Sequence, residues 1–300
     1  MPKEEYVTNP NSVLFKPDGR VYHLELKEGD VAKRLITVGS PNRADLISQL
    51  LDKDSVKSFV SSRQFTTFTG TFKGTPVTIV SIGMGSIMMD FMVREYLAIT
   101  NGPLAIIRIG TCGSFNKDIP PGNVITAKEG SIYIYRNYMH WDGTYNNVDD
   151  ATAKTLCAEP YFFTKPGKGS DQLQDLMASH FKSTNVPVSE GLNACGETFF
   201  ACQRREDPSY DDENKGVIPN LTNLAGTGKS IDFCEMETHE LFHLAKLSKT
   251  PIAAGACAIA LVNRHTSGVV GPDQLHQREE ECGKACLSAL VDLDVSNLKK

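Results

Sequence analysis

Short runs of apolar, β-branched residues recur along the chain and predict buried strands. Several of these runs are continuous rather than alternating, which is typical of strands covered on both faces. They occupy residues 35–38, 77–82, 106–109, 124–126 and 252–262. A segment of alternating character at 62–70 predicts a further strand, with Arg63 near its start.

Between the strands, apolar positions recur every three to four residues, which is the period of an amphipathic helix. The predicted helices cover residues 42–51, 86–100, 171–181, 238–247 and 272–293. Such alternation of strands and helices favours the α/β class. We therefore expect a three-layer αβα sandwich with a mixed central β-sheet.

Two stretches interrupt this order, at about 133–168 and 204–230, and both are rich in Gly, Pro, Asp, Asn and Tyr. Loops of that length are uncommon unless they cover a site or an interface. No repeat, low-complexity tract or linker divides the sequence. We expect a single domain over 1–300 that carries these two segments as insertions.

Composition narrows the class of ligand. The chain has 300 residues, of which 40% are hydrophobic, and a net charge of -5. That charge offers no basic field for nucleic acid, so an anion must be bound by a few placed cations. The start lacks the apolar core of a signal peptide, and no apolar run reaches the roughly 20 residues of a membrane helix. We expect a cytoplasmic protein with a small anionic substrate, bound to neither nucleic acid nor membrane.

Eight cysteines lie singly along the chain, mostly among apolar neighbours and without a CxxC pair. This spacing indicates reduced core residues rather than disulfides or zinc ligands.

The strand at 106–109 carries Arg108 and runs into Gly-Thr-Cys-Gly-Ser at 110–114. A guanidinium in a buried strand requires a carboxylate or a bound anion as its partner. The small residues leave backbone N–H groups open and Thr111 adds a hydroxyl, which together suit a phosphate oxygen. The segment predicts half of an anion site.

Glycine turns follow two other strands. At 39–43, Gly39 exposes its amide, Ser40 is placed as a helix N-cap and Pro41 takes the first helical position, which indicates either phosphate binding or simply a well-made helix entry. Gly83 and Gly85 invite a dinucleotide-binding interpretation, but the third glycine and the later acidic residue are missing. A tight turn near a ligand is the remaining interpretation.

Two later segments carry groups that suit a nucleoside. Gln203 and Arg205 stand two positions apart and can project to one side to read the edge of a pyrimidine ring, with Phe199 against sugar or base. Glu235 or Glu237 can accept from neighbouring hydroxyls of a ribose. For the segment of Gln203 and Arg205, the alternative is a charged loop with a core phenylalanine pair. For the segment of Glu235 and Glu237, the alternative is a helix start that carries acidic residues.

A competing motif lies in the same region, since His239-Glu240-Leu241-Phe242-His243 matches the H-E-x-x-H pattern of zinc peptidases. No obvious third ligand follows the motif, and a pattern of only five residues can arise by chance. The zinc peptidase stays a minor alternative.

Several motifs together resemble the nucleoside phosphorylase superfamily, which includes uridine phosphorylases and hexameric bacterial purine nucleoside phosphorylases. Gly-Ser-Pro-Asn-Arg at 39–43 is similar to the family's Gly-Asp-Pro-x-Arg turn, and Arg-Gln-Phe-Thr-Thr at 63–67 to its Arg-Glu-Phe-Thr-Thr strand. Arg-Ile-Gly-Thr-Cys-Gly at 108–113 and Cys-Glu-Met-Glu-Thr at 234–238 resemble its Arg-Ile-Gly-Thr-x-Gly and Glu-Met-Glu segments. Order and spacing hold from 23 to 264.

Within the family, Phe199, Gln203 and Arg205 resemble the Phe-x-x-x-Gln-x-Arg pattern of uridine phosphorylases. Purine enzymes carry an aspartate near the end of a late strand, whereas this chain has Asn263 and Arg264 there. The resemblance thus implies phosphorolysis of uridine to uracil and α-ribose 1-phosphate with inversion at C1′. Phosphate is the co-substrate and no organic cofactor is needed. A purine nucleoside phosphorylase and a non-catalytic nucleoside binder remain as alternatives.

The resemblance also assigns roles to individual residues. Phosphate would be held by Gly39, Arg43, Arg108 and Thr111, with Arg63 from a neighbouring subunit. The ribose would be held by Met236 and Glu237, with His23 of the partner near the 5′-hydroxyl. The base would be held by Phe199, Gln203 and Arg205, with Arg264 closing the site over uracil.

Three positions depart from the family. Ser40 replaces an aspartate, Gln64 replaces the glutamate that helps bind a monovalent cation between bacterial subunits, and Asp90 replaces a serine ligand. A Ca²⁺ ion at the interface is therefore an expectation. The insertion at 133–168 would obstruct a hexameric ring, and trypanosomatid-type uridine phosphorylases look similar, so we expect a homodimer with shared active sites.

Overall fold

A mixed sheet of ten strands runs through the part of the chain that the structure describes. The structure is a computed structural model, and it describes residues 6, 8–9, 11–143, 148–217, 230–266 and 268–300. The strands are β1 (Arg34–Val38), β2 (Lys57–Val60), β3 (Thr66–Phe72), β4 (Thr75–Ser81), β5 (Leu104–Ser114), β6 (Val124–Arg136), β7 (Tyr161–Phe163), β8 (Val188–Gly196), β9 (Phe233–Glu235) and β10 (Ile252–Asn263).

Helices of different length join the strands. The α-helices are α2 (Pro41–Ser48), α3 (Ser86–Ala98), α4 (Tyr138–Asp142), α5 (Asp150–Leu156), α6 (Asp171–Lys182), α8 (Thr238–Leu247) and α9 (Pro272–Asp292). The short 3-10 helices are η1 (Ala201–Gln203), η2 (Asn214–Gly216) and η3 (Val295–Asn297). The five buried strands and five helices expected from the periodicity are all present.

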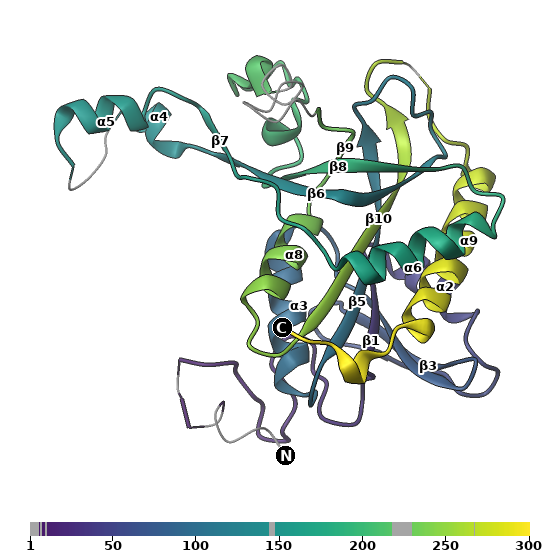
Figure 1. Cartoon of the computed structure of the whole chain (residues 1–300). Coiled ribbons are helices and arrows are strands. Elements are labelled where there is room, and N and C mark those ends of the chain that lie inside the picture. The colour runs from purple at the N-terminus through teal and green to yellow at the C-terminus, as the bar shows by residue number, and fades with distance from the viewer. Residues whose placement is uncertain (1–5, 7, 10, 144–147, 218–229, 267) are drawn as a thin grey trace.

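The helices cover both faces of the sheet, which confirms the three-layer αβα sandwich. Figure 1 shows α3 and α8 on one side of the central strands and α2, α6 and α9 on the other. Apolar side chains of α3 and α8, including Tyr96 and Phe242, pack into one core cluster. Side chains of α2, α6 and α9, including Ile47 and Met177, pack into a second cluster on the opposite face.

The sheet closes on itself at one end. β10 pairs with β5 along its whole length and with β6 through three residue pairs. β6 continues to β8, β8 to β9, and β9 returns to the end of β5. These strands therefore form a closed circuit, while β1, β4, β3 and β2 extend the sheet beyond β5.

The parallel strands bring their carboxyl ends to one edge. β1, β4, β5 and β10 run in the same direction, with Arg108 on β5 in register with Thr37 and Ala256. Ligands of α/β sheets bind at the carboxyl ends of the strands. The glycine turns after β1 and β4 lie at this edge, where Gly83 N donates to Gly39 O at 3.0 Å.

The segment at 133–168 differs from the irregular insertion that its composition indicated. It contains the last part of β6, α4, α5 and β7. Buried Ile132 and Ile134 alternate with the partly exposed Tyr133 and Tyr135, which is the period of a strand. Figure 1 shows the end of β6, α4, α5 and β7 projecting from the body of the molecule.

The second expected insertion, 204–230, lies partly outside the described residues. Up to residue 217 it consists of turns and η2.

None of the helices in the described ranges has both the length and the apolar character needed to cross a membrane. The eight cysteines are all free thiols and seven of them are buried, as their apolar neighbours predicted.

Candidate functional site

A cavity of about 490 Å³ opens at the carboxyl ends of the parallel strands. Nine of the residues assigned to phosphate, ribose or base line it, although they come from four separate segments of the chain. They are Gly39, Arg43, Arg108, Thr111, Phe199, Gln203, Arg205, Met236 and Glu237. Three of the assigned residues, His23, Arg63 and Arg264, are not among those that line it.

The floor of the cavity holds a buried ion pair. Arg108 NH2 donates to Glu237 Oε2 at 2.7 Å, and each side chain is only 4% exposed. The other oxygen of Glu237 accepts from the backbone N–H of Gly85. Nε and NH1 of Arg108 are buried without a hydrogen-bond partner among the described residues. Because a buried donor without a partner is costly, these two N–H groups point to an anion as their ligand.

The turn after β1 needs a glycine where it passes the turn after β4 and Arg108. A Cβ at Gly39 would come within 3.1 Å of Gly83 O and 3.6 Å of Arg108 NH2. Ser40 occupies the N-cap of α2, although its side chain makes no capping hydrogen bond. The unused backbone N–H groups of the helix start and its dipole both favour a negative charge here.

Arg43 reaches the cavity from α2 and is held by a carboxylate from the other end of the chain. Its Nε donates to Glu279 Oε1 on α9 at 2.7 Å, and its NH1 lies 3.4 Å from Ile109 O. Both side chains are mostly buried. Glu279 thus orients the guanidinium and leaves part of its donor set free for the cavity.

The opposite wall is formed by residues 199–205, which we call the base turn. Gln203 is buried and lines the cavity. The Arg205 guanidinium stacks on the Phe199 ring, with Cζ at 3.8 Å from the ring centroid. Burial, together with nearby Arg264, lowers the pKa of Arg205 from its usual value. This wall offers an amide and a stacked cation to a planar polar ring.

Glu235 also lines the cavity, but its carboxylate is occupied by other groups. Its carboxylate accepts from the backbone N–H groups of Glu237 and Thr238 and from Asn193 Nδ2 at 2.6 Å. Burial and the charge of Glu237 raise the pKa of Glu235 to about 7. Glu235 therefore supports the start of α8, and Glu237 is left to act at the cavity.

Arg264 contacts the base turn from outside the cavity. Its NH1 donates to Gln203 O at 3.1 Å and its NH2 donates to Arg204 O at 3.0 Å. Asn263, which stands where purine enzymes have an aspartate, is buried. Its Nδ2 donates to Asn116 O and Ile119 O, both at 2.9 Å. Asn263 is thus used to fasten the loop between β5 and β6.

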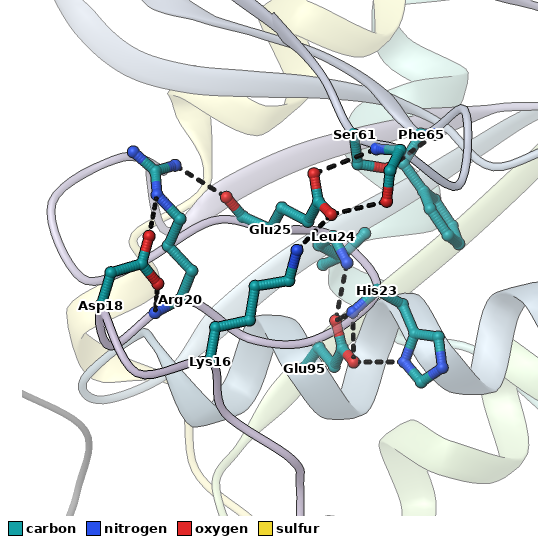
Figure 2. Close-up of polar contacts among 10 residues, drawn as sticks. Lys16, Asp18, Arg20, His23, Leu24, Glu25, Ser61, Phe65 and Glu95 are labelled. Atoms are coloured by element: carbon teal, nitrogen blue, oxygen red, sulfur yellow. Dashed lines mark hydrogen bonds and ion pairs between the residues drawn. The ribbon is translucent and has the colours of Figure 1, made fainter.

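His23 and Arg63 are not among the residues that line the cavity. Figure 2 shows Glu95 holding His23 through its backbone N–H and Nδ1. Glu25 accepts from the backbone N–H of Ser62 at 3.0 Å and from its hydroxyl at 2.6 Å. The exposed Arg63 lies with Ser62 in the turn before β3, so the strand begins at Thr66 and not at 62 as expected. Glu25 thus links the segment of His23 to that of Arg63.

Gln64 and Asp90 show little of a cation site within one chain. Gln64 is exposed in the turn before β3, with a φ of 68°. The Asp90 carboxylate on α3 accepts from Arg94 Nε. A hard cation such as Ca²⁺ takes six to eight oxygen ligands and competes poorly with a guanidinium. These residues fit such an ion poorly.

The H-E-x-x-H motif lies on α8. The rings of His239 and His243 are parallel, with centroids 6.3 Å apart. His239 Nδ1 lies 2.7 Å from Ser131 O, and the His239 ring also stacks with the ring of Tyr133. Within the described ranges no three His, Cys, Asp or Glu side chains gather closely enough to hold a metal ion. The motif therefore lacks a third ligand there.

The profile of the Phosphorylase superfamily matches residues 33–293. The chain belongs to this superfamily. A uridine phosphorylase of Thermococcus kodakarensis is 34% identical over 250 residues, which are 83% of this chain and 80% of that protein. A DeoD-type purine nucleoside phosphorylase of Bacillus thuringiensis is 35% identical over 121 residues, which are 40% of this phosphorylase and 51% of the relative.

Solved structures resemble this phosphorylase over nearly its whole length. A uridine phosphorylase structure from Phytophthora capsici has a TM-score of 0.83 and 33% identity, and covers 95% of this chain and 98% of its own. A nucleoside phosphorylase structure from Trypanosoma brucei has a TM-score of 0.74 and 24% identity, and covers 94% of this chain and 100% of its own. The second likeness supports the fold alone.

The structure adds site residues that the sequence motifs did not indicate. Glu279 belongs to a run of charges on α9 whose local pattern indicates only a solvated face. Cys112, Cys234, Leu261 and Val262 line the cavity of the phosphorylase with apolar or weakly polar surface. The strand of Leu261 and Val262 was predicted, whereas Cys112 lies beyond the expected end of its strand. Which end of each strand meets the cavity depends on the topology.

Proposed function

We propose that this phosphorylase cleaves uridine with inorganic phosphate to give uracil and α-ribose 1-phosphate. One observation carries the proposal. A single cavity joins cationic groups at Arg43 and Arg108 to a carboxylate at Glu237, and both to an amide and a guanidinium on the base turn. These groups match the three parts of the reaction, namely an oxyanion, a diol and a planar base.

Phosphate binds between the cations and the backbone of the first glycine turn. Nε and NH1 of Arg108, the free donors of Arg43, the amide at Gly39 and the Thr111 hydroxyl hold its oxygens. One oxygen then faces C1′ of the ribose from the side opposite the base. Holding both reactants in this geometry removes the entropic cost of their encounter from the chemical step.

Glu237 accepts from the ribose hydroxyls, and Met236 packs under the sugar. As the C1′–N1 bond breaks, its electron pair leaves on the uracil ring, where Gln203 and Arg205 stabilise the negative charge. A phosphate oxygen forms the new bond to C1′ from the opposite face, so the configuration inverts. The phosphate proton passes to the departing uracil, which balances the reaction without an organic cofactor.

A purine nucleoside is a weaker candidate for two reasons. Asn263 replaces the aspartate of purine enzymes and donates to loop carbonyls instead of facing the cavity. The similarity to the DeoD-type relative spans 40% of the chain, against 83% for the uridine phosphorylase relative.

A homodimer completes the site in this proposal. Met84 and Ile87 at the start of α3 are 76% and 72% exposed, and Leu14 and Tyr22 are also exposed apolar residues. Leu14 lines a hollow together with His23 and Phe91 of α3. A second copy that covers this apolar surface would bring its His23 and Arg63 to the nucleoside and phosphate. A sedimentation mass of six chains would contradict the dimer.

The interface cation stays a prediction, and no step of the reaction depends on it. Metal analysis of the protein before and after chelation, alongside Gln64→Ala and Asp90→Ala, tests it. The eight free thiols support a reducing compartment, and we place the enzyme in the cytoplasm.

Two matched variants test the reaction. Arg205→Ala should lower kcat/KM for uridine by about 10²-fold, because it removes a donor to the departing base. His243→Ala, at an exposed position of α8, should leave uracil release within about twofold, as a surface change away from the site does. Loss of activity in His243→Ala with full activity in Arg205→Ala would favour zinc chemistry. Binding of uridine without phosphorolysis would indicate a nucleoside binder.

A further inference from the structure

The base turn is held from two sides by side chains that lie outside it. Its backbone includes η1 and a left-handed residue, Arg204, with a φ of 49°. Within the turn, Arg205 N donates to Phe200 O at 2.9 Å. A left-handed arginine is an unfavourable conformation, so it persists only where the surroundings impose it.

Asn214 supplies part of that restraint. Its Nδ2 donates to Arg205 O at 3.0 Å and to Ala201 O at 3.3 Å. Asn214 is 5% exposed, although it belongs to residues 206–217, which we call the insertion segment. Two carbonyls of the base turn, those of Ala201 and Arg205, are thereby joined to one amide. Arg264 holds the middle of the turn through Gln203 O and Arg204 O.

The insertion segment is fixed in its turn by the projecting β6–β7 element. Asp212 Oδ1 accepts from Arg136 NH2 at 2.8 Å, and Asp212 O accepts from the hydroxyl of Tyr161. Val217 is buried in the same apolar cluster as Ala201 and Cys202. Contacts thus run from β6 and β7 through Asp212 to Asn214 and on to the base turn.

We infer that Asn214 is a positioning residue for base recognition. It acts through the backbone of Arg205, because its amide fixes the carbonyl of the residue whose guanidinium meets the base. This inference rests on the proposed function, since it assigns a role within the same site. It also gives the described part of the insertion a task, which is to hold the base turn in its binding conformation before the nucleoside arrives.

The inference predicts different effects of the variant on uridine and on phosphate. Asn214 touches the base turn and none of the assigned phosphate residues, so its loss should weaken nucleoside binding while phosphate binding persists. Asn214→Ala should raise KM for uridine about tenfold, because small displacements of positioned groups have large effects on rate. KM for phosphate should stay within about twofold.

Three companion variants sharpen the test. Asn214→Asp places an acceptor against two carbonyl oxygens and should raise the uridine KM further than alanine does. Asn214→Gln keeps the amide donor and should recover part of the loss. Lys215→Ala, at the exposed neighbouring position, should behave as wild type. If the Asn214 variants fold poorly, Asp212→Asn weakens the anchor of the segment without touching the buried amide, and it should shift the uridine KM in the same direction.

Melting temperature and equilibrium uridine binding are measured alongside the kinetics. A lower melting temperature with both KM values unchanged would overturn the inference, as would an equal rise of both KM values. If the wild-type protein binds uridine without cleaving it, the proposed function fails, and the Asn214 series is then decided by the uridine Kd. Failure of the wild type to bind uridine would overturn both.

Discussion

Arg108 and Glu237 meet at 2.7 Å in the floor of the cavity, so the group assigned to phosphate and the group assigned to ribose are partners. Each orients the other, and neither charge is left buried alone. The pair also joins the two halves of the reaction, since phosphate and sugar must be aligned on either side of the bond that forms. A change at one residue is therefore expected to reach both substrates.

Glu237→Gln tests this pairing. It keeps an oxygen for Gly85 but removes the charge opposite Arg108, and kcat/KM for uridine should fall about 10²-fold because a charged hydrogen-bond partner of the sugar is lost. Glu240→Gln is the matched control, because Glu240 lies three residues further along the chain, on α8, and is not among the residues that line the cavity. Initial rates at varied uridine concentration measure kcat/KM for both variants. Equal activity of the two variants would contradict the role of Glu237.

Glu279 should control phosphate affinity through Arg43. Glu279→Ala frees the guanidinium to leave its position, and KM for phosphate should rise about tenfold while KM for uridine stays unchanged. Glu279→Gln keeps an acceptor and should cause a smaller rise. Glu280→Ala, whose carboxylate pairs with Lys284 on the surface, serves as the control. An unchanged phosphate KM in Glu279→Ala would show that Arg43 needs no such support.

Glu25 should influence the partner's site if the dimer forms as proposed. Its carboxylate accepts from the backbone N–H and the hydroxyl of Ser62, the residue before Arg63. Glu25→Ala should raise KM for phosphate about threefold, because Arg63 of the partner subunit is less well placed. Lys27→Ala, at an exposed position nearby, should leave it unchanged. A shift in melting temperature alone would reduce Glu25 to a structural role.

Glu235 should give stability a specific dependence on pH. Burial and Glu237 raise its pKa to about 7, above the ordinary 4.5, so the folded state binds more protons than the unfolded state between these values. The contribution of Glu235 to stability is therefore fully present below pH 4.5 and is lost as pH rises toward 7. Urea unfolding of wild type and Glu235→Gln at pH 5 to 8 measures this. The wild type should lose stability relative to the variant as pH rises, and a constant difference would contradict the raised pKa.

Periodicity predicted most of the elements that build the sheet, because continuous apolar runs and helical repeats are local properties. The helix at 238–247 matches α8 residue for residue. The full length of β6 has no continuous apolar signal, because charged residues and Gly130 interrupt the strand after Thr126, where its pairing with β8 also shifts register. The closed circuit of strands through β10 could not be predicted from the sequence either. Which strands pair with the two edges of β10 is decided by tertiary packing.

The site residues also divide into those with a local sequence signal and those placed by tertiary packing. Gly39 could be predicted because it follows a strand, and parallel strands bring their carboxyl ends together. Thr111 lies at the same edge, but inside β5, which extends to Ser114 instead of ending at 109. Glu279 and Asn214 could not, because each acts on a segment with no local signal that links them. Glu279 stands 236 residues from the arginine that it holds. Asn214 lies in a stretch whose composition indicated only a loop.

The most direct test of the central claim measures the products formed from uridine. Purified protein is incubated with uridine, and in a parallel reaction with inosine, in the presence and absence of inorganic phosphate. Uracil and ribose 1-phosphate are quantified, and the anomer is assigned by NMR. The cavity predicts equal amounts of uracil and α-ribose 1-phosphate, formed only when phosphate is present. Uracil released without phosphate, or inosine consumed while uridine persists, would contradict it.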